Sequence, residues 1–285
     1  MDYHSDRFID SSLMFFDDNQ LCAVFPANRI DDHLYSHQGL TYGGFITDTS
    51  MTIVRLIECF QLLIQYMKDS QINQLTYKTI PYIYHKYLAD EDLYALFRNS
   101  ATLIRRDISS AVIPASELAF SDRRKRGIKK ALKSNIYTKE LSNLEEFYSI
   151  LADGLEEKYN VKPTHSLDEL KLLHERFPLN IRLFGASNET KKLLAAVLIY
   201  ETENVAHAQY ISSSNLGKEH GALDLLFNHL INNVYKNKKY FDFGISTEKQ
   251  GLILNEGLIN QKEGFGARAI TYDFYNIDLN KLKNL

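Results

Sequence analysis

Three consecutive segments in which apolar residues recur with a period of two constrain the fold of this chain most strongly. They span residues 181–186, 193–200 and 205–213, and turn-forming residues such as Asn188 and Asn204 separate them. Because a period of two places alternate side chains on opposite faces of a sheet, each segment predicts a strand. Short turns between consecutive strands predict an antiparallel meander.

Elements of both kinds follow the meander. Apolar residues over 223–234 recur three and four positions apart, which predicts a helix. A short strand over 240–243, a helix over about 252–263 and a strand over 267–275 are expected next. The second half of the chain therefore alternates helices and strands after its meander.

Two helices are expected before the meander. Ser142 with Glu145, and Ser166 with Glu169, have the spacing of a capping box. In this motif a hydroxyl and a carboxylate satisfy the first free N–H groups of a helix. Each pair therefore predicts a helix start.

The first half shows the same succession of elements. We expect strands over 13–16, 21–25 and about 34–46, a helix over 53–67 capped by Thr49, a strand over 74–80, a helix over 92–98 and a strand over 102–112. The shared order indicates a duplicated unit. We expect an α+β fold of two lobes, residues 1–120 and 121–285, each a mixed, mostly antiparallel sheet with flanking helices.

The composition excludes several classes of protein. A chain of 285 residues with 45% hydrophobic residues can build a sizeable core, which excludes a disordered protein. Its formal charge of -3 argues against a nucleic-acid binder with a wholly basic surface. Cys22 and Cys59 are its two cysteines, so neither a disulfide framework nor a metal site is expected. We find no signal peptide or membrane span and expect a cytoplasmic protein without a membrane partner.

Several short motifs resemble a known superfamily. The basic helix over 121–131, the turn over 240–244 (YFDFG) and the segment over 261–268 (QKEGFGAR) resemble tandem GNAT acyltransferases of the Fem type. Segments 36–44 and 78–85 look similar to a bacterial subgroup that acylates nucleotide-linked amino sugars for surface polysaccharides. The expected lobes are then GNAT-like, and residues 121–285 form the lobe that binds acyl-CoA.

The resemblance implies a reaction. An acyl group, acetyl or 3-hydroxybutanoyl, would move from CoA to the amine of a sugar such as a dTDP-3-amino-3,6-dideoxyhexose, by direct attack in a ternary complex and without a metal. One alternative is a Fem-type peptidyltransferase, the only reading in which a nucleic acid, tRNA, is a partner. Another alternative is a degenerate GNAT scaffold that binds without catalysis.

The loop between the third meander strand and the next helix is a candidate CoA site. Helix N-terminal N–H groups favour phosphate, and small residues allow close approach. The candidates here are Ser213, Ser214, Gly217, Lys218 and Gly221. The alternative is an ordinary loop capped by serines, because the segment matches the GNAT pyrophosphate turn only partly.

Two residues of the third meander strand complete the CoA site. If this strand splays from its neighbour, as in GNAT folds, backbone groups near Gln209 and Ile211 could pair with pantetheine amides. They could also polarise the thioester carbonyl. His207, on the same strand, is interpreted as a satisfied sheet histidine.

Three residues are candidates for proton transfer. His37 and His85 lie near the loops of the first half, and a base with a pKa near 7 suits the deprotonation of a sugar ammonium. Asp242 lies in a short apolar strand, where desolvation would raise the pKa of its carboxyl. Each residue also has a structural interpretation, which for Asp242 is a buried carboxylate bonded to backbone N–H groups.

The remaining candidates would bind the acceptor. Seven positive charges crowd the helix near 121–133, and from it we assign Arg123 and Arg124 to a diphosphate, although some of these charges must simply be solvated. By resemblance to Fem-type enzymes, Lys262 is assigned to a phosphate or an oxyanion. The alternative is that its charge interacts favourably with the dipole at a helix C-terminus. The similar segments of the first half supply Tyr42, Lys78 and Tyr84.

Overall fold

The computed structural model describes residues 6–116 and 118–281, except for the side chains of residues 158 and 159. The chain forms two compact units. The first comprises Met1–Ile108, Thr247–Ile253 and Thr271–Leu285, and the second comprises Ser109–Ser246 and Leu254–Ile270. These ranges differ from the expected 1–120 and 121–285, because the long strands Thr102–Val112 and Arg268–Asp278 each contribute residues to both units.

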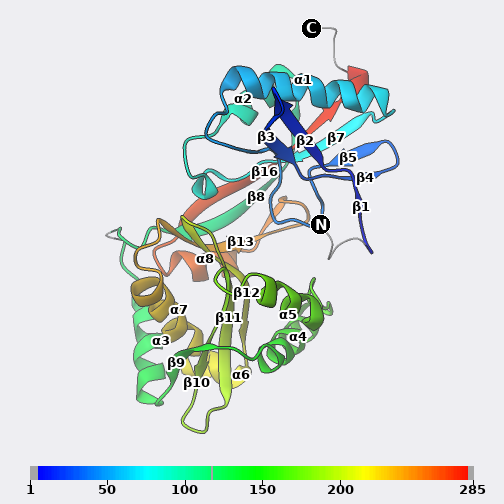
Figure 1. Ribbon diagram of the computed structural model, residues 1–285. Coiled ribbons are helices and arrows are strands. Elements are labelled where there is room, and N and C mark those ends of the chain that lie inside the picture. The colour runs from blue at the N-terminus through cyan, green and yellow to red at the C-terminus, as the bar shows by residue number, and fades with distance from the viewer. Residues whose placement is uncertain (1–5, 117, 282–285) are drawn as a thin grey trace. The chain divides into compact units, whose positions relative to one another are not determined.

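The first unit contains a mixed sheet and a smaller sheet, with helices. Its mixed sheet has the order β1-β4-β5-β7-β16-β8, and β2, β3 and β6 form the smaller antiparallel sheet (Figure 1). The bounds are β1 Ile9–Asp10, β2 Leu13–Asp17, β3 Gln20–Phe25, β4 Asn28–Ile30, β5 His33–Tyr35, β6 Ile46–Thr47, α1 Ile53–Asp69, β7 Gln74–Lys78, η2 Tyr82–Tyr84, α2 Glu91–Arg98, β8 Thr102–Val112, β14 Thr247–Glu248, β15 Ile253–Leu254, β16 Arg268–Asp278 and η4 Leu279–Lys281.

Two details of the first unit differ from the sequence expectation. The long strand over 34–46 is wrong, because only β5 and the short β6 are strands and a loop joins them. Helix α1 is capped by Thr52, whose hydroxyl accepts from the N–H of Arg55, rather than by Thr49. The apolar face of α1 then packs on aromatic residues such as Phe25 and Tyr77, whose rings stack at 5.9 Å.

The second unit has the sheet order β8-β13-β12-β11-β10-β9. Figure 1 shows α3 and α7 on one face of this sheet and α4 and α5 on the other. The bounds are α3 Asp122–Lys133, β9 Tyr137–Leu141, α4 Glu145–Tyr159, α5 Leu167–Arg176, β10 Ile181–Ser187, β11 Leu193–Glu201, β12 Val205–Ser213, α6 Asn215–His220, α7 Ala222–His229, the π-helix η3 Leu230–Val234, β13 Tyr240–Ile245 and α8 Glu256–Glu263.

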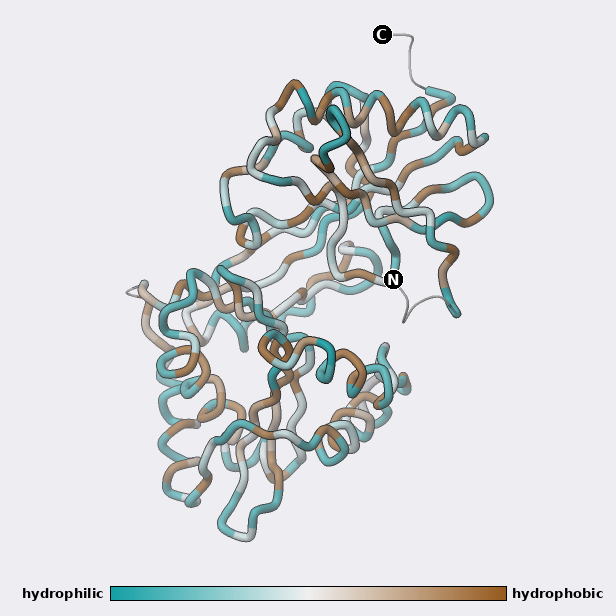
Figure 2. Tube along the Cα trace, viewed as in Figure 1, coloured by the Kyte–Doolittle hydropathy of each residue, from teal (hydrophilic) through white to brown (hydrophobic). Residues whose placement is uncertain are grey.

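The predicted meander is confirmed as β10, β11 and β12, which pair antiparallel in sequence order. Strand β9, which the sequence pattern did not indicate, pairs with the outer side of β10. Hydrophilic and hydrophobic residues alternate along the helices, as expected for elements with one buried face (Figure 2). The α+β class is therefore as predicted.

Helix starts in the second unit show which caps form. The capping box of Ser166 and Glu169 is present, with both reciprocal hydrogen bonds. The one predicted at Ser142 is wrong, because the side chain of Asn143 accepts from the N–H of Glu145 instead. Helix α8 begins at Glu256 rather than near 252, because Asn255 caps it.

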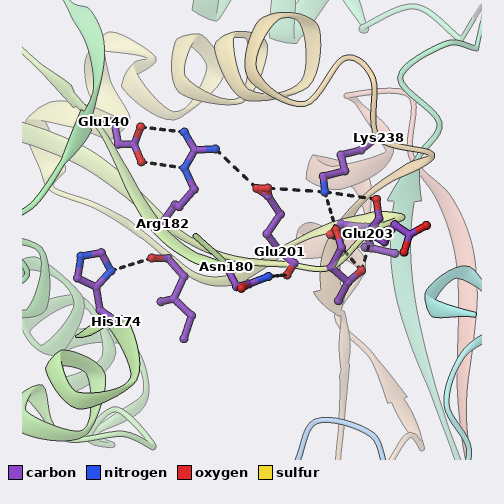
Figure 3. Close-up of polar contacts among 10 residues, drawn as sticks. Glu140, His174, Asn180, Arg182, Glu201, Glu203 and Lys238 are labelled. Carbon is purple, nitrogen blue, oxygen red and sulfur yellow. Dashed lines mark hydrogen bonds and ion pairs between the residues drawn. The ribbon is translucent and has the colours of Figure 1, made fainter. Parts of the chain in front are cut away.

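An ion-pair network ties β9 to the meander (Figure 3). Arg182 on β10 donates two hydrogen bonds of 2.8 Å to Glu140 on β9, and its guanidinium also lies 3.6 Å from the carboxylate of Glu201. Lys238 reaches the same carboxylate at 3.6 Å and donates to the carbonyl of Thr202. Positive and negative side chains alternate along this network. Such a network stabilises the fold more than isolated surface ion pairs do.

Among the residues described, no helix combines the length and the apolar character needed to cross a membrane.

Candidate functional site

Strands β12 and β13 begin as neighbours and then separate. They pair in parallel at Val205↔Tyr240, Ala206↔Phe241 and His207↔Asp242, where the register ends. Both strands continue, β12 to Ser213 and β13 to Ile245. On its other side β12 stays paired with β11 as far as Ser213↔Ala195. The sheet therefore opens on one side of β12, as we expected for a GNAT fold.

The alternation of the β11–β12 ladder determines which backbone groups face this opening. The N–H of Ser214 donates to the carbonyl of Leu194 at 2.9 Å. Because backbone groups in an antiparallel ladder point alternately to either neighbour, those of Ile211 and Ser213 point away from β11. The ladder also shifts register around Gln209, the extra residue of a β-bulge. The groups that point into the opening thus belong to the predicted residues Ile211 and Ser213.

A cavity of about 580 Å³ lies at this opening. Its walls come from α4 on one face of the sheet, from α7 on the other face, and from β12, β13, α6 and α8. It therefore passes through the sheet where β12 and β13 diverge. Most of the lining is apolar, and includes Ile150, Leu151, Leu155, Ile211, Leu223, Phe227, Phe243, Leu258 and Phe265. Its size and lining are typical of a small-molecule site.

Lys262 on α8 is the buried cation of the cavity wall, with 4% of its surface exposed. Its ammonium donates to the carbonyls of Gly244 and Ile245 and to the Ser246 hydroxyl, each at 2.8 Å. Burial lowers the pKa of this ammonium to about 8, although nearby Asp242 opposes the shift. Because an ammonium has three N–H donors, Lys262 contributes charge and holds the end of β13 rather than offering a free donor to a substrate.

Ser212 lines the same cavity and is almost fully buried. Its hydroxyl oxygen has no hydrogen-bond partner among the residues that the structure describes. A buried hydroxyl without a partner is unfavourable, and such groups in native proteins need an explanation. Ser212 begins the candidate loop 212–218 but is not among the residues that the sequence assigns to CoA, because its place in a cavity wall depends on the separation of β12 from β13.

Asp242 is fully buried where the β12–β13 ladder ends. One carboxylate oxygen accepts from the Ser109 hydroxyl at 2.5 Å and from the N–H of Gly244 at 3.1 Å. The other lies 2.8 Å from Nδ1 of His207. These contacts fit the structural interpretation of Asp242, and they orient His207. This contact fits the interpretation of His207 as a satisfied sheet histidine, although the sequence does not identify its partner, which lies 35 residues away in the chain.

The loop after β12 is built for packing. The Ser214 hydroxyl caps α6 by accepting from the N–H of Gly217. A Cβ added at Gly217 would lie 2.2 Å from the carbonyl oxygen of Leu194, so this glycine lets α6 approach β11. A Cβ at Gly221, where φ is +74°, would meet the backbone of α3 at 2.5 Å. These contacts fit the serine-capped loop that was the alternative to a phosphate site.

Two predicted residues of this loop nevertheless reach the cavity. Ser213 and the exposed Lys218 both line it, and the ammonium of Lys218 donates to the side chain of Asn215 at 3.0 Å. Lys218 therefore adds positive charge at the cavity wall.

The two arginines of helix α3 that the sequence assigns to a diphosphate differ in burial. Arg124 is 8% exposed, donates to Asp224 at 2.5 Å and covers the ring of Phe265 at 5.3 Å. It joins α3 to α7 and is not a solvated arginine available to a diphosphate. Arg123, beside it in the sequence, is exposed.

The first unit brings several predicted acceptor residues together. The Lys78 ammonium donates to the carbonyls of His37 at 3.1 Å and Leu40 at 2.6 Å. Burial lowers its pKa to about 8. The rings of Tyr42 and Tyr84 lie 4.5 Å apart. Lys78 therefore holds the loop after β5. Tyr42 of the same loop forms an aromatic pair with Tyr84.

The two predicted histidines of this unit differ in environment. His37 is 1% exposed, has a φ of +50°, and its Nδ1 accepts from the N–H of Gly39 at 3.1 Å. This hydrogen bond occupies the ring nitrogen that could act as a base on that side. His85 ends η2 and is half-buried. Across residues 6–116 and 118–281, no group of three His, Cys, Asp or Glu side chains is placed to hold a metal ion.

Comparison with known proteins was made at three levels. No family model matches the sequence, and no curated protein matches it. The fold, however, is shared with solved structures. FemX aligns with a TM-score of 0.71 at 12% identity, over 96% of this chain and 89% of that chain. L-PGS from Bacillus licheniformis aligns at 0.64 and 12% identity, over 95% and 85%. A tandem GNAT protein from the clavulanic acid biosynthesis pathway aligns at 0.50 and 10% identity, over 96% and 85%.

The chain has a GNAT-like fold. The likeness extends over nearly the whole chain. At these identities the likeness concerns the fold alone.

Proposed function

We propose that this chain is an acyltransferase that takes its acyl group from a CoA thioester and transfers it to an amine. The observation that carries the proposal is the end of the β12–β13 ladder at His207↔Asp242, with a cavity through the sheet beyond it. A thioester donor needs such a site, because its long arm must enter the protein while its reactive carbon meets a second substrate. The GNAT-like fold supports the same class of reaction.

The donor would bind as an added strand. The backbone groups of Ile211 and Ser213 point into the opening, where they can pair with the two amides of the pantetheine arm. The apolar walls suit the carbon atoms of the arm and exclude water. Lys218 adds positive charge for the CoA phosphates.

The chemistry is a direct attack. The neutral acceptor amine forms a C–N bond with the thioester carbon, the C–S bond breaks, and the CoA thiolate leaves and takes up the proton that the amide nitrogen loses. N–H groups of β12 beyond His207 stabilise the oxyanion of the tetrahedral intermediate. We propose His207, held by Asp242, as the base for the ammonium proton, in place of Asp242 itself. His37 and His85 are the competing candidates.

The acceptor that we propose is a nucleotide-linked amino sugar such as a dTDP-3-amino-3,6-dideoxyhexose. This choice is supported by the likeness of segments 36–44 and 78–85 to enzymes of that class. The aromatic pair of Tyr42 and Tyr84 could stack on a base or a sugar ring. Exposed Arg123 is the arginine of α3 that remains a candidate for a diphosphate.

A second candidate is aminoacyl transfer. It is favoured by the fold likeness to FemX and to L-PGS, which have the two higher TM-scores among the three structures compared. An aminoacyl group could occupy the same cavity, but its donor would be a tRNA.

One ligand panel separates the two candidates. Acetyl-CoA, a dTDP-amino sugar and an aminoacyl-tRNA are each titrated in a thermal-shift assay, because a ligand of the native state raises Tm. The proposal predicts shifts with acetyl-CoA and the dTDP-amino sugar and transfer of labelled acetyl between them. A shift and transfer with aminoacyl-tRNA but not with acetyl-CoA would replace the first candidate by the second.

A further inference from the structure

Gly154 lies inside helix α4, at the cavity wall. Apart from proline, glycine is the least favourable residue in a helix interior, so a glycine there needs a reason. Usual reasons are a positive φ or a close neighbour. Gly154 is not among the glycines with positive φ, and a Cβ added to it would meet no heavy atom of the described side chains and backbone within 4 Å.

Gly185 and Gly217 of the same unit have such a reason. A Cβ on Gly185 would lie 2.6 Å from side-chain atoms of Leu141 and Leu193, and one on Gly217 would lie 2.2 Å from a carbonyl oxygen. In contrast, the space that Gly154 leaves open belongs to the cavity. Its helix neighbours Ile150, Leu151 and Leu155 line the same wall and make it mostly apolar, and Glu157 is the charged residue that this helix adds to the lining.

The buried hydroxyl of Ser212 is a second, independent sign of an occupant. It lies in the wall of the same cavity and has no partner among the described residues. A ligand with a polar group beside its apolar chain would satisfy it.

We propose that Gly154 determines which acyl chains this protein accepts. The inference rests on the acyl-CoA donor proposed above. The donor would carry an unbranched apolar acyl chain longer than acetyl, lying along α4 over Gly154, while a carbonyl oxygen of the donor accepts from Ser212. Gly154 is a specificity residue, since it leaves room for the chain and takes no part in the bond changes.

The test is a titration with acetyl-, butanoyl-, hexanoyl- and octanoyl-CoA. In the wild type, affinity rises with chain length by up to about fourfold per buried methylene until the space is filled. Gly154→Leu fills the space, so octanoyl-CoA binds at least about tenfold more weakly than to wild type, while acetyl-CoA stays within about twofold. Ser212→Ala weakens every acyl-CoA alike.

Two further variants separate specificity from folding. Gly154→Ala raises Tm by about 2–4 °C, since alanine is the better helix former and its methyl group meets open space. Ser149→Leu, on an exposed position of the same helix, leaves the chain-length profile unchanged. Equal affinity for all chain lengths, or a lower Tm for Gly154→Ala, would overturn the role of Gly154 and leave the acyltransferase proposal standing. Failure of every acyl-CoA to bind would overturn both.

Discussion

Nδ1 of His207 lies 2.8 Å from a carboxylate oxygen of Asp242, and the same two residues form the last pair of the parallel ladder between β12 and β13. The carboxylate also accepts from Ser109 on β8. One buried side chain thus connects three adjacent strands at the point where the sheet opens. It orients the histidine at the last pair of this ladder.

Substitution of Asp242 should therefore affect stability as well as transfer. Asp242→Ala leaves the buried donors of Ser109 and Gly244 without their acceptor and should lower the free energy of unfolding by about 3–5 kcal/mol. Asp242→Asn keeps one acceptor oxygen and should lose less. Urea unfolding of both variants measures this, and a loss below about 1 kcal/mol for Asp242→Ala would contradict the connecting role.

Arg124 and Arg123 are neighbours on α3 with different burial, so their alanine variants can be compared directly. Arg124→Ala leaves the half-buried Asp224 without this partner and should lower the free energy of unfolding by about 3 kcal/mol. Arg123→Ala, at an exposed position, should change it by less than about 0.5 kcal/mol. Denaturant unfolding measures the difference. Equal stabilities would show that the ion pair with Asp224 does not join α3 to α7.

The proposal that Lys218 helps to bind the CoA phosphates can be tested by substitution. Lys218→Ala should weaken the binding of CoA by about fivefold at low salt, because a positive charge at the cavity wall is lost. The difference should shrink at about 0.5 M salt, where exposed charges are screened. Calorimetric titration at both salt concentrations measures it, with Lys236→Ala as the exposed control. An equal effect on dTDP-sugar binding would contradict the assignment to CoA.

Lys262 predicts a dependence of stability on pH. Its pKa is about 8 in the folded protein and 10.5 as the reference value. Between these values the unfolded chain binds more protons, so this group makes the free energy of unfolding rise as pH increases from 8 to 10.5. Subtracting the profile of Lys262→Met removes the contribution of tyrosines. A difference that is flat over this range would contradict the burial of a charged lysine.

Local elements of the fold could be predicted from the sequence because their causes are local. The capping box at Ser166 and the alternation in β10 to β12 depend on residues a few positions apart. The box at Ser142 failed for an equally local reason, since Asn143 competes for the same N–H group. The strand predicted over 34–46 is wrong, because most of this segment forms a loop whose carbonyl at Leu40 accepts from the Lys78 ammonium.

The sequence predicted only part of the candidate site. Ile211, Ser213 and Lys218, which the sequence assigns to CoA, and Lys262, which it assigns to the acceptor, all line the cavity, and their roles stay predictions. The three hydrogen bonds of Lys262 to Gly244, Ile245 and Ser246 depend on the end of β13. The partnership of His207 with Asp242 requires a parallel pairing that no local pattern encodes. Gly154 belongs to no sequence motif. The role that we propose for it rests on the open space beside helix α4, which only the structure shows.

The central claim is that a thioester donor binds where β12 leaves β13. Hydrogen–deuterium exchange with and without acetyl-CoA tests it most directly, because the donor should pair with the backbone of Ile211 and Ser213. The account predicts slower exchange in β12 beyond His207, with little change in β9 and β10. Binding of acetyl-CoA without protection of these amides, or no binding at all, would contradict it.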